Sequence, residues 1–289
     1  MKKLNVALTF ILLFITVVPP NINAEAPPFM EVHFIDVGQG DSILVETPND
    51  KTILIDGGLP KAGNKVVSYL KKQKIEKIDL LIATHPDYDH IGGLIHVMKS
   101  FEVKQILDTG KIHLTRAFAK YAAEIRKQGI PKKVAKPNQR IQLDSDLTIQ
   151  VLNAYQKDQS NNESSIVLKM TYNEMDFLFM GDATIKQEKK LMEKYDIQSE
   201  IMKVAHHGSD TSTSLEFLRE VNPQIAILTF SVDNDYGHPV ERVVENLDRI
   251  EANVYSTASF GDIIIRTNGK NFFVFPSRDP TDNLLRYSV

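Results

Sequence analysis

Four side chains that can bind metal ions lie within six residues of this chain: His85, Asp87, Asp89 and His90. They directly follow residues 79–83, an apolar run that predicts a buried strand, so we expect the cluster where that strand ends. Two imidazoles and two carboxylates at this spacing repel one another or are poorly solvated unless a cation lies between them. A polar turn with unrelated histidines is the alternative, and it explains less well why four such side chains lie within six residues. The segment therefore predicts a metal site.

Two later apolar runs also end in polar side chains. Residues 177–180 lead into Gly181 and Asp182, and residues 201–205 lead into His206 and His207. Glycine permits a sharp turn, which would leave Asp182 projecting from the strand end. A Gly-Asp turn is common by itself, whereas a pair of histidines after an apolar run is unusual. We expect both segments to contribute to the same site.

The pattern at residues 85–90 resembles the His-x-His-x-Asp-His signature of the metallo-β-lactamase superfamily, with Asp87 at the second histidine position. Together with residues 34–42, Phe-Ile-Asp-Val-Gly-Gln-Gly-Asp-Ser, it is similar to one branch of that superfamily. This branch contains the hydrolase domain of ComEC-type DNA-uptake (competence) proteins. The likeness runs from about Glu31 to about Phe275. It implies an α/β (α+β) fold, an αββα sandwich with its metal centre at one edge of the sheets.

The resemblance also implies a set of metal ligands made of three histidines and three aspartates: His85, Asp87, Asp89, His90, Asp182 and His206. In this pattern Asp182 bridges two ions, with His85 and Asp87 on one of them and the other three ligands on the second. His206 is preferred to His207 as the ligand. His207 would then lie near the substrate or orient another ligand.

Further residues are expected around the ligands. The positions implied to support them or to contact substrate are Asp41, Asp56, Asn162 and His207, and the implied catalytic residues are Asp89, Asp182 and His238. Asn162 either supplies an oxygen ligand or a hydrogen bond, or forms an Asx turn before a strand. His238 either donates a proton or contacts a phosphate, or caps the helix that follows.

Such a site predicts hydrolysis without a serine or cysteine nucleophile. Two divalent ions lower the pKa of a coordinated water and stabilise charge on the reacting group. A donor set rich in carboxylates favours Mn²⁺ or Mg²⁺, while the imidazoles also suit Zn²⁺. The chain has no cysteine, which excludes a lipobox, disulfides and thiolate ligands.

The leading functional prediction is an exported phosphodiesterase or nuclease that acts on DNA. The rival is a hydrolase of another extracellular ester, such as a phosphorylcholine ester or a lactone, and a metal-containing binding module without turnover is a third hypothesis. The formal net charge is −3, which argues against general coating of nucleic acid. Basic residues still cluster locally at 61–77 and 126–140; they are either solvated helix faces or a phosphate track. No protein partner can be inferred.

The first residues indicate how the protein is localised. Lys2 and Lys3 precede an almost wholly apolar stretch at 6–18, Pro19 and Pro20 break it, and Ala24 is the expected last residue removed, although Ile22 is an imperfect small residue for the cleavage site. This predicts a signal peptide over residues 1–24 and a secreted, extracytoplasmic protein without a stable membrane span after cleavage. An uncleaved N-terminal anchor is the alternative. A single hydrolase domain over 29–276 and a tail over 277–289 would follow.

Two runs of strands, each followed by strand–helix units, must position these residues. The predicted strands are 31–37, 42–47, 52–56, 80–84, 147–152, 165–170, 176–180, 201–205, 224–230, 253–256, 262–266 and 271–275, and the predicted helices are 62–73, 185–195, 214–221 and 240–250. This order predicts two packed sheets flanked by helices.

Overall fold

The structure is a computed structural model of the chain, and it describes residues 28–280. The predicted signal peptide, residues 1–24, lies outside this range, as does most of the predicted tail, 277–289. Within the described range, no helix combines the length and the apolar character that crossing a membrane requires.

Eight strands form the first sheet, in the order β17-β16-β1-β2-β3-β5-β7-β8. The strands from β17 to β3 pair antiparallel, and those from β3 to β8 pair parallel. Their bounds are β1 Met30–Phe34, β2 Ile43–Glu46, β3 Thr52–Ile55, β5 Leu80–Ile82, β7 Ile106–Asp108, β8 Lys132–Val134, β16 Ile263–Thr267 and β17 Phe272–Pro276.

Seven strands form the second sheet, in the order β15-β14-β13-β12-β11-β10-β9, and a short pair joins β4 to β6. The strands from β9 to β12 pair antiparallel, and those from β12 to β15 pair parallel. Their bounds are β9 Arg140–Ile141, β10 Leu147–Asn153, β11 Val167–Tyr172, β12 Met175–Phe179, β13 Ile201–Lys203, β14 Ile225–Leu228, β15 Asn253–Ser256, β4 Lys77–Ile78 and β6 Glu102–Val103.

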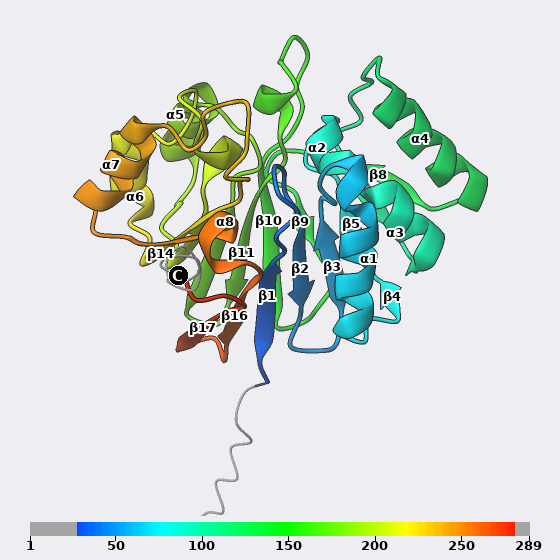
Figure 1. The fold of residues 1–289 in the computed structure, drawn as a ribbon, viewed down its shortest axis with the longest axis horizontal. Coiled ribbons are helices and arrows are strands. Elements are labelled where there is room, and N and C mark those ends of the chain that lie inside the picture. The colour runs from blue at the N-terminus through cyan, green and yellow to red at the C-terminus, as the bar shows by residue number, and fades with distance from the viewer. Residues whose placement is uncertain (1–27, 281–289) are drawn as a thin grey trace, which may run out of the picture.

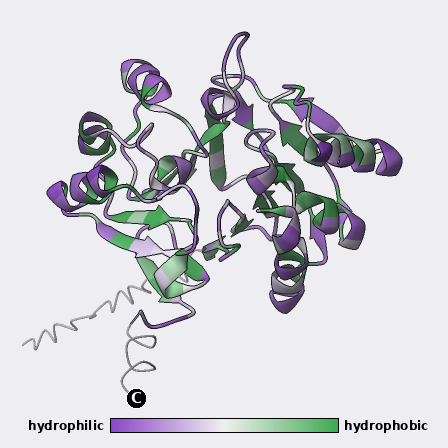
Figure 2. Cartoon of the chain, turned by 45° about the horizontal axis from the view of Figure 1, so that its top comes forward, coloured by the Kyte–Doolittle hydropathy of each residue, from purple (hydrophilic) through white to green (hydrophobic). Residues whose placement is uncertain are grey.

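Helices flank the two sheets on their outer sides (Figure 1). The helices that follow strands of the first sheet are α1 Gly63–Lys72, α2 Tyr88–Ile91, α3 Leu94–Ser100 and α4 Arg116–Gln128. The others are α5 Ile185–Lys194, α6 Leu215–Val221, α7 Glu241–Arg249 and α8 Thr257–Phe260, with short 3₁₀ turns η1 Pro60–Ala62, η2 Asn162–Ser164 and η3 Ala205–Gly208. The helices are largely hydrophilic where they face outward (Figure 2).

The alternation of side chains along each strand explains the layers. In β5, Leu80 and Ile82 belong to the core between the sheets, whereas Leu81 packs toward the helices. In β12, Phe177 and Phe179 likewise face the first sheet. Strands that bury both faces must be apolar at nearly every position, which is why they read as continuous apolar runs. The predicted αββα sandwich is confirmed.

The strands β3, β5, β12 and β13 bring their carboxyl ends to the same edge of the sandwich. Backbone hydrogen bonds join these ends: Asp56 N donates to Ile82 O at 2.9 Å, and His206 N donates to Gly181 O at 2.9 Å. Strand β13 ends at Lys203, two residues before the predicted end, because the chain turns into η3. Polar segments that are far apart in the sequence therefore meet at this edge.

Candidate metal centre

Asp56 anchors the part of the site that comes from the first sheet. It directly follows β3 and is fully buried. Its Oδ1 accepts from Thr84 N at 2.8 Å, and its Oδ2 accepts from Thr84 Oγ1 at 2.5 Å. The same Oδ2 lies 2.8 Å from His90 Nδ1. A carboxylate can only accept there, so His90 carries its proton on Nδ1 and turns Nε2 into the site.

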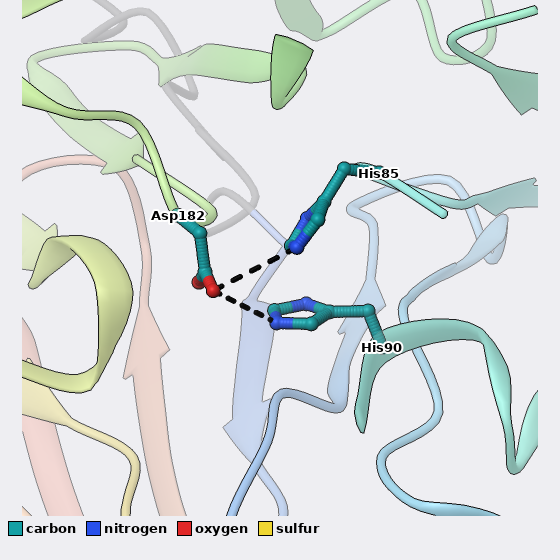
Figure 3. Close-up of side chains that lie close together, drawn as sticks. All are labelled: His85, His90 and Asp182. Carbon is teal, nitrogen blue, oxygen red and sulfur yellow. Dashed lines mark ion pairs between the residues drawn. The ribbon is translucent and has the colours of Figure 1, made fainter. Parts of the chain in front are cut away.

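Asp182 lies at the centre of the site, surrounded by four imidazole nitrogens. Its Oδ2 is 3.3 Å from His90 Nε2, 3.7 Å from His85 Nε2 and 3.6 Å from His206 Nε2. Its Oδ1 is 3.6 Å from His207 Nε2. Figure 3 shows His85 and His90, from the first sheet's side, converging on Asp182 from the second. Such a central carboxylate has the placement that a bridging ligand requires.

Several buried polar atoms at this point have no hydrogen-bond partner within the described residues. They are His85 Nε2, His90 Nε2, His207 Nε2 and Asp182 Oδ1. Unpaired buried polar atoms are costly in a folded protein, and here they all face one another. One of the sets of close donor atoms is His85, His90 and Asp182; another is Asp89, His90 and His207. These donors therefore fit divalent metal ions.

The adjacent residues His206 and His207 occupy different positions in the site, which the sequence alone does not show. His207 is 1% exposed, and its Nδ1 lies 2.7 Å from the carbonyl oxygen of Thr229. Because a carbonyl only accepts, Nδ1 carries the proton and Nε2 offers its lone pair, 3.8 Å from Asp89 Oδ2. His207, which the sequence prediction placed near substrate, thus groups with Asp89 and His90.

His206 occupies the more open side of the site. Its side chain is 19% exposed, its Nδ1 lies 3.0 Å from Thr211 Oγ1, and its Nε2 lies 3.3 Å from Asn162 Nδ2. It reaches Asp182 Oδ2 but joins none of the close donor groups among the described residues. We therefore propose His207, in place of the predicted His206, as the ligand beside Asp89 and His90.

The charges at the centre are mutually dependent. Burial raises the pKa of Asp182, but the neighbouring imidazoles of His90 and His207 outweigh it and hold the pKa well below its usual range. Burial lowers the pKa of His90, but the carboxylates of Asp182, Asp56 and Asp89 raise it well above its usual value. The carboxylates and the imidazoles of the centre therefore each favour the charged form of the other.

Asp87 lies at the rim, beside His85. Its Oδ2 is 3.4 Å from His85 Nε2, and its Oδ1 accepts from Asn161 Nδ2 at 2.5 Å. Burial opposes ionisation of Asp87, but the neighbouring imidazole of His85 outweighs it and lowers the pKa of Asp87. His113 Nε2 lies 3.7 Å from Asp87 Oδ1. Neither Asn161 nor His113 is among the site residues that the sequence predicts, although Asn161 directly precedes the predicted Asn162.

Asp41 lies behind the site rather than at its rim. It is 2% exposed, and its Oδ2 lies 2.9 Å from Nζ of Lys203, which is 1% exposed. Its Oδ1 accepts from Thr229 Oγ1 at 2.5 Å and lies 3.4 Å from His207 Nδ1. Burial raises the pKa of Asp41, but the Lys203 ammonium group outweighs it and the net shift is downward. Lys203 was missed, although a lysine inside the apolar run 201–205 is a visible signal.

Gly40 explains how the Asp41 loop reaches this position. Its φ is +119°, and a Cβ there would lie 2.2 Å from the carbonyl oxygen of Asp89. Asp41 N donates to that same oxygen at 3.4 Å. The loop can therefore pack against α2 only with glycine at this position.

A cavity of about 270 Å³ opens onto the centre, and its lining includes the predicted residues Asn162 and His238. The ring centroids of His238 and His206 are 5.4 Å apart, and His238 Nδ1 has no hydrogen-bond partner within residues 28–280. Burial lowers the pKa of His238, and the nearby His206 lowers it further. Asn162 begins η2, beside His206.

Comparisons with known proteins identify a matching family and several relatives. Residues 35–231 match the family described as "Metallo-beta-lactamase superfamily". "ComE operon protein 3" of Bacillus subtilis (strain 168) is 31% identical over 291 residues, covering 93% of this chain and 37% of that protein. "Competence protein ComA" of Neisseria gonorrhoeae is 30% identical over 216 residues, covering 72% of this chain and 28% of that protein. The chain thus spans well under half the length of either relative.

A solved structure supports the fold alone. CmlA, a diiron β-hydroxylase from Streptomyces venezuelae, superimposes with a TM-score of 0.54 at 13% identity, covering 79% of this chain and 52% of that chain.

Proposed function

The chain belongs to the metallo-β-lactamase superfamily and is a metal-dependent hydrolase related to competence proteins; from this premise we propose that it is a two-metal phosphodiesterase that cleaves DNA. The family and the branch predicted from the sequence are both confirmed. The observation that supports the proposal is the convergence of four imidazole nitrogens on the Asp182 carboxylate. Export rests on the predicted signal peptide, residues 1–24, which lie outside the described residues.

The residues divide into two half-sites that share Asp182. His85 and Asp87 would hold one ion, and Asp89, His90 and His207 the other; His206, 3.6 Å from Asp182 Oδ2, lies on the open side of the site. When bound, two divalent ions activate water and neutralise charge on a phosphoryl group. The donor set contains three carboxylates, which favours Mn²⁺ or Mg²⁺, while Zn²⁺ suits the imidazoles.

The chain's own residues supply positioning. Asp56 fixes the ring of His90, and the Thr229 carbonyl fixes that of His207, so both Nε2 atoms are held toward Asp182 before any ligand arrives. His238 lines the open cavity with a ring nitrogen that has no partner among residues 28–280, and there it can bind a phosphate oxygen or exchange a proton with the leaving group.

The test uses purified protein and Asp182→Ala. The parent should cleave DNA with Mn²⁺ and not after chelation, and Asp182→Ala should lose at least one ion and nearly all activity while its circular dichroism stays native. Asp176→Ala is the matched control, since Asp176 lies on β12 but pairs with Lys169 outside the centre. Full two-ion occupancy in Asp182→Ala would overturn the ligand assignment. A parent that cleaves carboxylic esters but no phosphodiester would overturn the proposed reaction.

A further inference from the structure

Two tyrosines lie at the mouth of the metal centre with much of their rings in solvent. Tyr88 begins α2 between Asp87 and Asp89, and Tyr236 lies in the loop before α7. They are 49% and 56% exposed, and their hydroxyls are 3.3 Å apart. Both line the cavity of the centre. Large exposed rings beside a polar site offer a stacking surface that the core does not use.

The tyrosines are held in place as a pair. The Tyr236 ring stacks on His238, with centroids 5.6 Å apart and planes 23° apart. A tyrosine phenol is uncharged at neutral pH, and the hydrogen bond with Tyr88 raises the pKa of Tyr236 further, to about 12. An uncharged aromatic surface can stack with any nucleobase, because every base has a π face.

Tyr88 also borders two larger cavities that lead away from the centre. One, of about 730 Å³, lies along α3 and α4 and is lined by His96, Lys99, Arg116 and Lys120. The other, of about 460 Å³, is lined by Tyr236, by Lys61 and by two aspartates of the 231–240 loop, so its aspartates outnumber its one lysine. A polyanion that leaves the metal centre past Tyr88 would favour the basic cavity over the acidic one.

The cations of this basic groove, defined as Lys99, Arg116 and Lys120, are exposed and form no ion pair with any described residue. Glu124 also borders the cavity, but it is buried and accepts from Gln128 Nε2 at 2.8 Å. Arg116 stands in the first turn of α4, which has no acidic residue there. A cation in a first turn opposes the helix dipole, and both favour an anion at that end.

The basic cluster near 132–136 fits this purpose less well. Lys132 Nζ lies 3.0 Å from Asp108 Oδ2, so its charge is already compensated. Lys132 and Lys133 stand on the edge strand β8, and neither lines the cavity at the metal centre or the basic groove.

We propose that the site acts on single-stranded nucleic acid, with an unpaired base stacked on Tyr88 and Tyr236 and the adjoining phosphates held by the basic groove. This inference rests on the proposed phosphodiesterase function and deepens it. A base in a duplex is already stacked on its neighbours, so only an unpaired one gains from the tyrosines. Base pairing therefore makes a duplex a poorer substrate than a single strand.

The first test removes the stacking surface. Tyr88→Leu/Tyr236→Leu should raise KM for single-stranded DNA about 10-fold or more, the effect expected for losing a stacked base. Tyr88→Phe/Tyr236→Phe keeps the rings without the hydroxyl contact and should stay within about 3-fold of the parent. Metal content is measured in both, because Tyr88 adjoins two proposed ligands. Equal KM values in the Leu and Phe variants, at equal metal content, would overturn the stacking role.

The second test removes the charge. Lys99→Gln/Arg116→Gln/Lys120→Gln should flatten the log–log salt dependence of single-strand binding by about 2, because each phosphate contact contributes about 0.7. The control Lys133→Gln/Lys136→Gln changes two exposed lysines outside the groove. If both variants change the slope equally per charge removed, the basic groove is not the phosphate-binding surface.

Cleavage assays on the parent protein test the single-strand preference separately from the phosphodiesterase activity. A parent that cleaves no DNA or RNA refutes the phosphodiesterase itself. A parent that cleaves blunt duplex as well as single strands refutes the inference and leaves the phosphodiesterase standing. Cleavage of DNA and RNA strands of matched sequence shows which of the two nucleic acids is the substrate.

Discussion

Lys203→Met should lower the free energy of unfolding by about 3–5 kcal/mol, the loss that follows when one partner of a buried ion pair is removed. The ammonium group lies 2.9 Å from Asp41 Oδ2 and donates to the Val204 carbonyl at 2.8 Å. Asp41 would remain buried with its charge uncompensated. Because it keeps the hydrogen bond from Thr229 Oγ1, we expect a loss toward the lower end of that range.

A second lysine provides the matched control. Lys169 on β11 lies 2.9 Å from Asp176 Oδ2, the same separation, but the Asp176 side chain is 24% exposed. Solvent can stabilise that carboxylate, so Lys169→Met should cost only about 1 kcal/mol. Asp41→Asn/Lys203→Met removes both buried charges and should recover part of the loss.

The assay is urea denaturation of the metal-free protein at pH 7, followed by circular dichroism. Chelation is needed because bound ions would add their own stabilisation to the folded state. If Lys203→Met loses no more than Lys169→Met, burial does not govern the strength of these pairs and the reasoning fails. The reasoning also fails if Asp41→Asn/Lys203→Met is less stable than Lys203→Met alone.

Three further outcomes follow from the site and from one histidine outside it. Asp87→His should shift the preferred metal from Mn²⁺ toward Zn²⁺; an unchanged ranking in an activity titration would remove Asp87 from the ligands. His207→Ala should lose more bound metal than His206→Ala by elemental analysis, and the reverse order would restore the original assignment. Burial lowers the pKa of His33, but the carboxylates of Glu31 and Glu46, 3.4 and 3.2 Å from its Nε2, outweigh burial and raise the pKa. That stabilisation is complete below about pH 6.5 and is lost as pH rises through the folded pKa. The Tm advantage of the parent over His33→Gln should therefore shrink as the pH is raised, and a constant difference would contradict it.

The order of the central elements follows from the sequence because the central strands of both sheets are buried on both faces. Apolar runs such as 80–82 and 177–179 leave few alternatives, and the polar residues after them mark the strand ends. Motifs at those ends locate the candidate site before any coordinates are known. The prediction succeeds here because the local strand pattern and burial in the folded protein both require apolar residues at the same positions.

The roles of individual side chains are less accessible, since they depend on partners distant in the chain. His206 and His207 both adopt positive φ, 48° and 55°, in η3, and this turn decides which ring faces inward. The orientation of His207 is set by the Thr229 carbonyl on the neighbouring segment. Lys203 is buried only because the Asp41 loop packs over it. None of these contacts leaves a periodic signal.

The position of Asp182 shows why the site depends on the packing of the whole sandwich. The first sheet supplies His85, Asp89 and His90, and the second supplies Asp182 and His207, so neither sheet alone holds a complete set of donors. The separation between the halves is set by side chains of the core between the sheets, which interdigitate at close-packed density. A change that shifts one sheet against the other would move Asp182 relative to both histidines of the first. Core substitutions far from the centre should thus act on metal affinity through geometry, even where no ligand is altered.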